Sequence, residues 1–172
     1  MADIAAVLDE HLAAEFERHD VDAAMATMAP DPYLEHVPMM TGGSGRAEVR
    51  RFYSDFWLPS WPDDVAVTPI SRTVGEERVV DELIVAFTHD RPVPFMLPGI
   101  EATGRQVRLP HVVVVTFEDG LILSEHVYWD QGSLLVQAGL LDPSTVPVTG
   151  AEQADKLLDP RRRGGSEVMP GW

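Results

Sequence analysis

The stretch from Thr73 to Leu141 constrains the fold of this chain more than any other part of it. Its segments are rich in Val, Ile and Thr, and hydrophobic residues recur in them at a period of two, which predicts long strands at 78–89, 106–117 and 121–129. The Asp119-Gly120 pair predicts a tight hairpin turn between the last two. A meander of strands is therefore expected, with a further strand at 65–73 before it and a short helix at 133–140 after it.

The N-terminal third has helical periodicity instead. Apolar residues from Ile4 to Phe16 share one helix face, and Asp20 can cap a second helix that ends near Met28, before two prolines. A short strand is expected at 33–39, a glycine-rich loop at 41–45, and the strongest helix at 49–57. Helices that precede a strand meander predict an α+β fold, in which the helices pack on one face of a curved antiparallel sheet.

Composition excludes several classes of function. The chain has 172 residues, 45% of them hydrophobic, which suffices for one domain with a core. It has no cysteine, so disulfides, a cysteine nucleophile and thiolate metal sites are excluded. A net charge of −15 argues against nucleic acid or an anionic membrane as partner. With no leader-like segment and no membrane-length apolar run, we expect a cytoplasmic protein.

The last thirty residues differ in composition from the rest. Prolines and glycines discourage regular structure after residue 141, apart from a brief helix near 151–158. We therefore expect one domain at 1–141 and a C-terminal extension at 142–172. Trp172 is the expected anchor of this extension, against its own domain or a neighbouring subunit.

Isolated ionisable side chains within apolar strands indicate a pocket, because burial of an unpaired charge is costly. His111 shares a strand face with valines and leucines, and the side chains beside it depend on the hairpin. A two-residue turn at Asp119-Gly120 would place His126 and Tyr128 there. A three-residue turn with a bulge at Gly120 would place Glu125 and Val127 there.

Several short segments, in this order and spacing, resemble the SnoaL-like polyketide cyclases of the nuclear transport factor two-like superfamily. They are His36-Val37-Pro38, Gly45-Arg46, Pro98-Gly99, Thr103-Gly104-Arg105, Glu118-Asp119-Gly120, Glu125-His126, Asp130 and Leu134-Leu135 followed by Gly139-Leu140. The resemblance covers about residues 3–141. It implies a cone-shaped α+β barrel with a deep cavity, a homodimer through the outer sheet face, and acid/base chemistry without a cofactor.

The string from His126 to Gln131 also resembles a subgroup often labelled carboxymethylenebutenolidase. Dienelactone hydrolases of that name have an α/β-hydrolase fold and a cysteine nucleophile. This chain has no cysteine and no Gly-x-Ser-x-Gly elbow, so the label does not describe its chemistry.

The resemblance also implies which residues carry the chemistry. Relatives have a catalytic aspartate at the position of Val127, so the resemblance favours the register with a bulge at Gly120. Glu125, two residues away on the same face, could replace that aspartate. Glu125 and His111 would then form an acid/base pair across neighbouring strands. His36 lies where relatives often have a polar pocket residue. Further catalytic candidates are the inward-facing member of Asp81 and Glu82, and, in the other register, His126 and Asp130.

Candidate substrate contacts are aromatic or apolar side chains on the same elements. They lie on the strongest helix, on the 91–103 connection and on the last two strands: Tyr53, Phe56, Trp57, Phe95, Met96, Val113, Val127, Tyr128 and Trp129. No histidine pair has the spacing of a zinc protease helix and no known ligand pattern matches, so neither a metal nor a cofactor is expected.

Together with these residues, the resemblance implies a cofactor-free acid/base enzyme acting on an apolar, oxygenated small molecule. The expected reaction is proton abstraction next to a carbonyl, followed by ring closure or isomerisation. Two alternatives stay open at this point: an epoxide or lactone hydrolase, and a non-catalytic dimeric module that binds a small molecule. Pocket acids with perturbed pKa values would favour catalysis.

Overall fold

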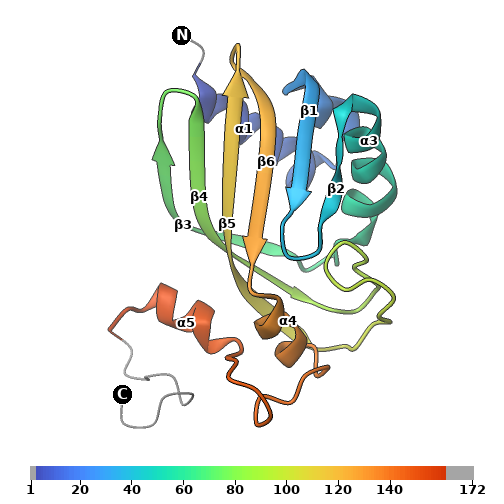
Figure 1. The fold of residues 1–172 in the computed structure, drawn as a ribbon, viewed down its shortest axis with the longest axis vertical. Helices are drawn as coiled ribbons and strands as arrows, with labels where there is room; N and C mark the ends of the chain where they lie inside the picture. Colours follow the sequence, from blue (N-terminus) through green and yellow to red (C-terminus); the bar gives the residue numbers. More distant parts are fainter. Residues whose placement is uncertain (1–2, 162–172) are drawn as a thin grey trace.

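One six-stranded sheet with helices on one face forms the body of the protein in the computed structural model, which describes residues 3–161 (Figure 1). The strand order is β2-β1-β6-β5-β4-β3. The strands are β1 Met28–His36, β2 Thr41–Ser44, β3 Ala66–Val74, β4 Arg78–Thr88, β5 Gln106–Glu118 and β6 Leu121–Trp129. The expected α+β class is confirmed, but β2 and β3 are edges, so the sheet is open and is not a closed barrel.

The sheet is mixed, where the sequence predicted an antiparallel one. β1 runs parallel to β6, and every other neighbouring pair is antiparallel. The expected loop at 41–45 instead supplies the edge strand β2. Gly42 makes this close pairing possible, because a Cβ at that position would lie 2.0 Å from the carbonyl oxygen of Leu34.

The N-terminal helices carry the side chains that face the sheet. Helix α1 (Ile4–Ala13) continues into a π-helical segment, η1 (Ala14–Arg18), and α2 (Val21–Ala26) follows. Asp20 accepts a hydrogen bond from the backbone N–H of Ala23, as expected of a capping residue. Figure 1 shows α1 crossing behind the sheet. No helix in the described residues is long and apolar enough to span a membrane.

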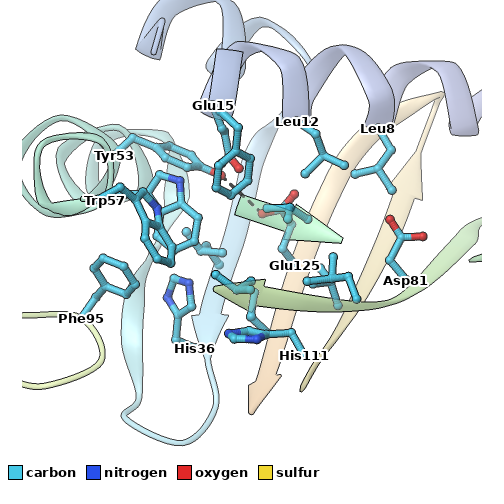
Figure 2. Close-up of a pocket in the computed structure, with 18 of the residues that line it drawn as sticks. Leu8, Leu12, Glu15, His36, Tyr53, Trp57, Asp81, Phe95, His111 and Glu125 are labelled. Carbon is cyan, nitrogen blue, oxygen red and sulfur yellow. Dashed lines mark hydrogen bonds between the residues drawn. The ribbon is translucent and has the colours of Figure 1, made fainter. Parts of the chain in front are cut away.

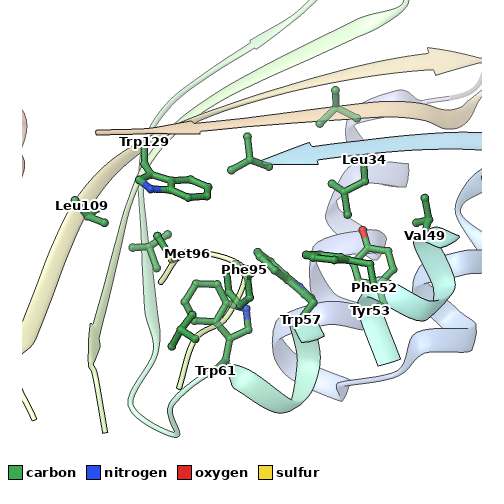
Figure 3. Close-up of a cluster of buried hydrophobic side chains, with 14 of the residues drawn as sticks. Leu34, Val49, Phe52, Tyr53, Trp57, Trp61, Phe95, Met96, Leu109 and Trp129 are labelled. Atoms are coloured by element: carbon green, nitrogen blue, oxygen red, sulfur yellow. The ribbon is translucent and has the colours of Figure 1, made fainter. Parts of the chain in front are cut away.

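A second helical stretch runs beside β1 and β2. It begins as α3 (Gly45–Phe52), widens into a π-helical segment, η2 (Tyr53–Trp57), and ends as the 3-10 turn η3 (Leu58–Ser60). Its inner face packs aromatic rings against the sheet (Figure 3). The widened turn breaks the regular helical spacing, and Phe56, expected on the inner face, is 38% exposed.

The β5–β6 hairpin has the register favoured from the sequence, but the extra residue lies within β6 and not in the turn. Asp119 and Gly120 both have positive φ and form a two-residue turn. The extra residue is Leu123, because Thr116 pairs with Ser124 while Phe117 pairs with Ile122. Beyond this bulge, Val115 pairs with Glu125 and Val113 with Val127, so both β6 residues share a face with His111.

The extension after residue 141 packs on the start of β5. The linker helix α4 (Gln131–Gln137) leads to it, and α5 (Glu152–Leu158) is held by an Arg108–Asp155 ion pair of 2.6 Å. The Ser133 hydroxyl donates to the carbonyl oxygen of Gly150 at 3.0 Å. The prediction that Trp172 anchors the extension falls outside the described residues.

Arg46 ties the start of the second helical stretch to the α2–β1 connection. Its guanidinium donates to the carbonyl oxygens of Met25, Met28 and Ala29 at 2.7, 3.2 and 3.2 Å. We expect Arg46→Ala to lower the free energy of unfolding by about 2 kcal/mol, because these carbonyls lose a charged donor. Urea denaturation measures this loss. Arg50→Ala is the control, since its exposed pair with Asp22 should contribute under about 0.5 kcal/mol; equal losses would contradict the prediction.

Candidate active site

A cavity of about 430 Å³ lies between the N-terminal helices, η2 and the inner face of the sheet (Figure 2). Its walls are mostly apolar and aromatic. Eleven of the residues singled out from the sequence line it: His36, Tyr53, Trp57, Asp81, Phe95, Met96, His111, Val113, Glu125, Val127 and Trp129. The bulge at Leu123 is what turns Glu125 and Val127 toward this space.

The structure places the other five candidates away from the cavity. Phe56 and Tyr128 are exposed, and His126 packs edge-on against the ring of Tyr33 on the opposite face of the sheet. Asp130 caps α4 by accepting from the backbone N–H of Ser133. Glu82 accepts from the hydroxyl of Ser71, across the neighbouring strand.

Asp81, not Glu82, is the inward-facing acid of β4, and it is already paired. Both of its carboxylate oxygens accept from the guanidinium of Arg72 at 2.6 Å. A carboxylate held in this bidentate manner has a donor on each of its oxygens, so neither oxygen is left to face a substrate. Asp81 therefore shapes the edge of the cavity and is a poor candidate for a general base.

Glu125 is the centre of a buried polar cluster, which comprises Glu125, His11, Glu15 and Tyr53. One carboxylate oxygen of Glu125 lies 3.3 Å from Nε2 of His11, and the other accepts from the Tyr53 hydroxyl at 3.3 Å. The same His11 nitrogen lies 3.2 Å from a carboxylate oxygen of Glu15. All four side chains are buried. The expected pairing of Glu125 with His111 is not observed among the described residues; the histidine partner is His11.

The orientation of His11 follows from its other ring nitrogen. Thr27 donates its hydroxyl hydrogen to the carbonyl oxygen of Ala24, so its oxygen is free to accept from His11 Nδ1 at 2.7 Å. Nδ1 also lies 3.2 Å from that carbonyl oxygen. A protonated Nδ1 held by these two acceptors directs Nε2 at the carboxyl groups.

Burial and mutual charge shift the pKa values in this cluster. Burial raises the pKa of Glu125 from 4.5 to about 7, although the positive charge of His11 opposes the rise. Burial by itself disfavours the charged form of His11, but the negative charges of Glu125 and Glu15 outweigh it and raise its pKa from 6.5 to about 9. Near neutral pH, His11 is therefore protonated while Glu125 exchanges its proton.

Two further histidines in the cavity wall are neutral. Burial lowers the pKa of His36 to about 3 and that of His111 to about 4. Nδ1 of His111 bonds the carbonyl oxygen of Leu109 at 3.0 Å, which fixes the ring without help from a charged partner. His111 is thus an uncharged part of the wall near Trp129, where the sequence suggested a proton relay.

His11 and Glu15 are the site residues that sequence reasoning missed. Neither residue is among the candidates named from the sequence. A signal was present: Leu8, Leu12 and Glu15 follow the i, i+4, i+7 spacing of one helix face, so a carboxylate continues an apolar stripe. A charged residue in that position indicates a buried partner.

The same cluster contains the donor set most suited to a metal ion in the described residues. His11, Glu15 and Glu125 each offer a ligand atom, and these atoms lie within 4.8 Å of one another. A divalent cation there would have to displace the proton on His11 Nε2. The hydrogen bonds just described already satisfy this nitrogen, so the cluster is complete as a proton-holding site.

The sequence matches the model of the SnoaL-like domain over residues 9–125, which is more than half of the chain. The chain belongs to the SnoaL-like family. The matched range includes His11 and Glu15, and its last residue is Glu125. No curated protein matches the chain. The carboxymethylenebutenolidase label is not supported by the family match or by the similar structures.

Solved structures share the fold of this SnoaL-like chain at low identity. AclR of Streptomyces galilaeus is 23% identical, with a TM-score of 0.62 over 81% of this chain and 87% of that one. TsrD of Streptomyces laurentii is 22% identical, with a TM-score of 0.61 over 80% and 96%. SalBIII is described as an epoxide hydrolase/cyclase-like enzyme with a role in pyran ring formation in salinomycin. It is 19% identical, with a TM-score of 0.54 over 74% of this chain and 90% of that one. These likenesses establish the fold.

Proposed function

We propose that this protein is a cofactor-free enzyme that removes a proton from carbon next to a carbonyl group of an apolar small molecule. One observation carries the proposal: a buried carboxyl, Glu125, faces an apolar cavity with a pKa raised to about 7 and a phenol hydroxyl at 3.3 Å. A base with a pKa near the working pH is partly ionised, so it is free to accept a proton, and it still binds that proton strongly enough to remove it from the substrate. The resemblance of the fold to a cyclase-like enzyme supports the same class.

Tyr53 is suited to stabilise the oxyanion. Burial, and then the charge of Glu125, raise the pKa of Tyr53 well above 10, so its hydroxyl stays protonated and can only donate or accept a hydrogen bond. As Glu125 takes the proton, the C–H electron pair forms a carbon–carbon double bond and the carbonyl π pair moves to the oxygen, which gives an enolate. The Tyr53 hydroxyl turns from the carboxylate to this oxygen and donates to it.

The remaining steps need no group from outside the substrate and the site. In an isomerisation, Glu125 returns the proton at a different carbon. In a ring closure, the enolate carbon attacks a second carbonyl carbon, and Glu125 gives its proton to the alkoxide oxygen that forms. His11 stays protonated throughout, and its charge keeps Glu125 partly ionised near neutral pH. Glu125 therefore takes the role that the resemblance assigns to an aspartate at the position of Val127.

Exchange of hydrogen for deuterium tests this proposal without the natural substrate. We expect the protein to speed exchange of the protons next to the carbonyl of tetralone, a bicyclic aromatic ketone, in D₂O followed by NMR. The rate should rise with pH and level off above about 7, because only ionised Glu125 accepts a proton. The proposal would be overturned if exchange were no faster than in buffer, or if the exchange rate did not rise with pH and level off in this way.

Hydrolysis of an epoxide is the second candidate, and one observation favours it. Two carboxyl groups, Glu15 and Glu125, reach the same cavity and are joined through His11. One could donate a proton to the epoxide oxygen while the other activates water. Incorporation of oxygen-18 from labelled water into a diol product would favour this reaction over enolate chemistry.

A further inference from the structure

The ionised side chains that line the cavity all carry the same sign of charge. Among the described residues, the lining has no lysine and no arginine, and it has five carboxyl groups: Asp9, Glu15, Glu17, Asp81 and Glu125. They come from α1, η1, β4 and β6, so they border the space from the helices and from the sheet. Figure 2 shows Glu15, Asp81 and Glu125 around the cavity. A bound molecule is therefore exposed to negative charge from both layers.

Few positive charges offset these carboxyl groups. One cation, His11, is shared by the two carboxyl groups of the buried polar cluster. Another, Arg72, is shared by Asp9 and Asp81 at 2.6 Å from each. The two histidines in the lining are neutral and add no positive charge. Within the described part of the chain, two cations thus face five carboxyl groups.

Uncompensated negative charge lies at the mouth of the cavity. Three lining residues, Asp9, Glu17 and Val67, are exposed, so the cavity opens to solvent between the N-terminal helices and the edge strand β3. Arg18, the cation next to Glu17 in the chain, bonds Glu10 at 2.5 Å. A cleft that is lined by one sign of charge and has low-dielectric walls focuses the field and concentrates ions of the opposite sign.

The apolar part of the lining also suits a cation. Aromatic side chains make up much of it: Phe16, Tyr53, Trp57, Trp61, Phe95 and Trp129. The π-electrons of such rings attract an ammonium group, and those of tryptophan do so most strongly. Phe16, which precedes the exposed Glu17, packs against Trp57 and Trp61 with ring centroids 6.0 and 6.1 Å apart. Aromatic rings therefore continue from the mouth into the cavity.

We propose that the substrate is an otherwise apolar ketone that carries one ammonium group, and that the carboxyl groups of the mouth attract this group while the cavity rejects carboxylates and phosphates. This rests on the proposed function, which places the carbonyl group at the buried Tyr53 and leaves the ammonium toward the exposed Asp9 and Glu17. An aliphatic amine has a pKa of about 10, as lysine has, so it arrives charged. An ammonium near the carbonyl also makes the adjacent C–H protons more acidic, because it withdraws electrons, and this helps a base as weak as a carboxylate.

Three tetralones that carry an aminomethyl, a hydroxymethyl or a carboxyl group at the same ring position test the proposal. The first two substituents have nearly the same size and differ in charge. Calorimetric titration at neutral pH gives Kd for each. We expect the aminomethyl ketone to bind about tenfold more tightly than the hydroxymethyl ketone, and the carboxyl ketone about tenfold more weakly. Both differences should shrink in about 0.5 M NaCl, because salt screens exposed charges.

Glu17→Gln removes one charge from the mouth and keeps the shape of the side chain. It should reduce the preference for the aminomethyl ketone by about threefold, and Asp9→Asn should act in the same direction. The double variant should lose most of the preference. Glu101→Gln is the matched control, because it makes the same change at an exposed carboxyl group outside the lining and should leave the preference unchanged.

Equal Kd values for the aminomethyl and hydroxymethyl ketones in the native protein would overturn the proposal. So would tighter binding of the carboxyl ketone, a preference that survives in the double variant, or binding of none of the three. The exchange experiment uses tetralone without a charged substituent and is therefore independent of this test. Exchange without a charge preference refutes only this inference, and a charge preference without exchange refutes only the proposed reaction.

Discussion

Glu125→Gln is expected to lower the rate of proton exchange next to the ketone carbonyl by about 10³-fold, the usual contribution of a positioned general base. Glutamine has the same shape and can still accept from the Tyr53 hydroxyl, but it cannot take up a proton. The Kd of the ketone should change little, and the dependence of the rate on pH near 7 should disappear. NMR exchange rates and calorimetric titration on the same samples measure both quantities.

Glu82→Gln is the control for this change. Glu82 lies on the same sheet, with its carboxylate bonded to Ser71 and outside the cavity, and its replacement should leave exchange at the native rate. If Glu125→Gln retained most of the exchange activity, the base would have to be another group, and the proposed reaction would fail. A loss in both variants would point to a general effect of removing negative charge.

His11→Leu is expected to reduce the free energy of unfolding by about 3–5 kcal/mol near pH 6.5, because it leaves two carboxyl groups buried without their cation. The folded protein holds the His11 pKa at about 9, above its ordinary 6.5. The stabilisation is therefore complete below pH 6.5 and is lost as the pH rises to about 9. In the native protein this amounts to a fall of about 3 kcal/mol over that range.

Urea denaturation at several pH values measures both effects. The double variant His11→Leu with Glu125→Gln is the informative comparison, since it removes one of the stranded carboxylates. It should recover part of the stability that His11→Leu loses, which marks the two residues as coupled. If the double variant lost as much unfolding free energy as the two single variants together, the ion pair between His11 and Glu125 would contribute nothing to folding.

Local pattern was enough to predict most elements, and the family resemblance added the face of β6 that carries Glu125. The helical and alternating periods specify which side of an element is apolar, but they left both hairpin registers open, and the favoured one followed from the family resemblance at Val127. The position of the bulge could not be found this way, because Leu123 and Gly120 as the extra residue give the same alternation beyond the turn.

The partner of Glu125 was beyond the reach of local pattern. His11 and Glu125 are more than a hundred residues apart, and periodicity shows that a helix packs on the sheet without showing where it crosses. The edge strand β2 was missed for a similar reason: its four residues have no alternating apolar pattern, and the close approach to Leu34 that Gly42 permits is a tertiary contact. Phe56 was misplaced because the helix widens at Tyr53.

Both helical stretches widen into a π-turn at the residue that reaches the cavity, Glu15 in η1 and Tyr53 in η2. A π-turn holds one more residue than the α-helical turn it replaces. The widened turn, and not regular α-helical spacing, thus sets the direction of the Glu15 and Tyr53 side chains. Deleting one residue from either segment is therefore expected to restore a regular helical turn and to move that side chain relative to the cavity.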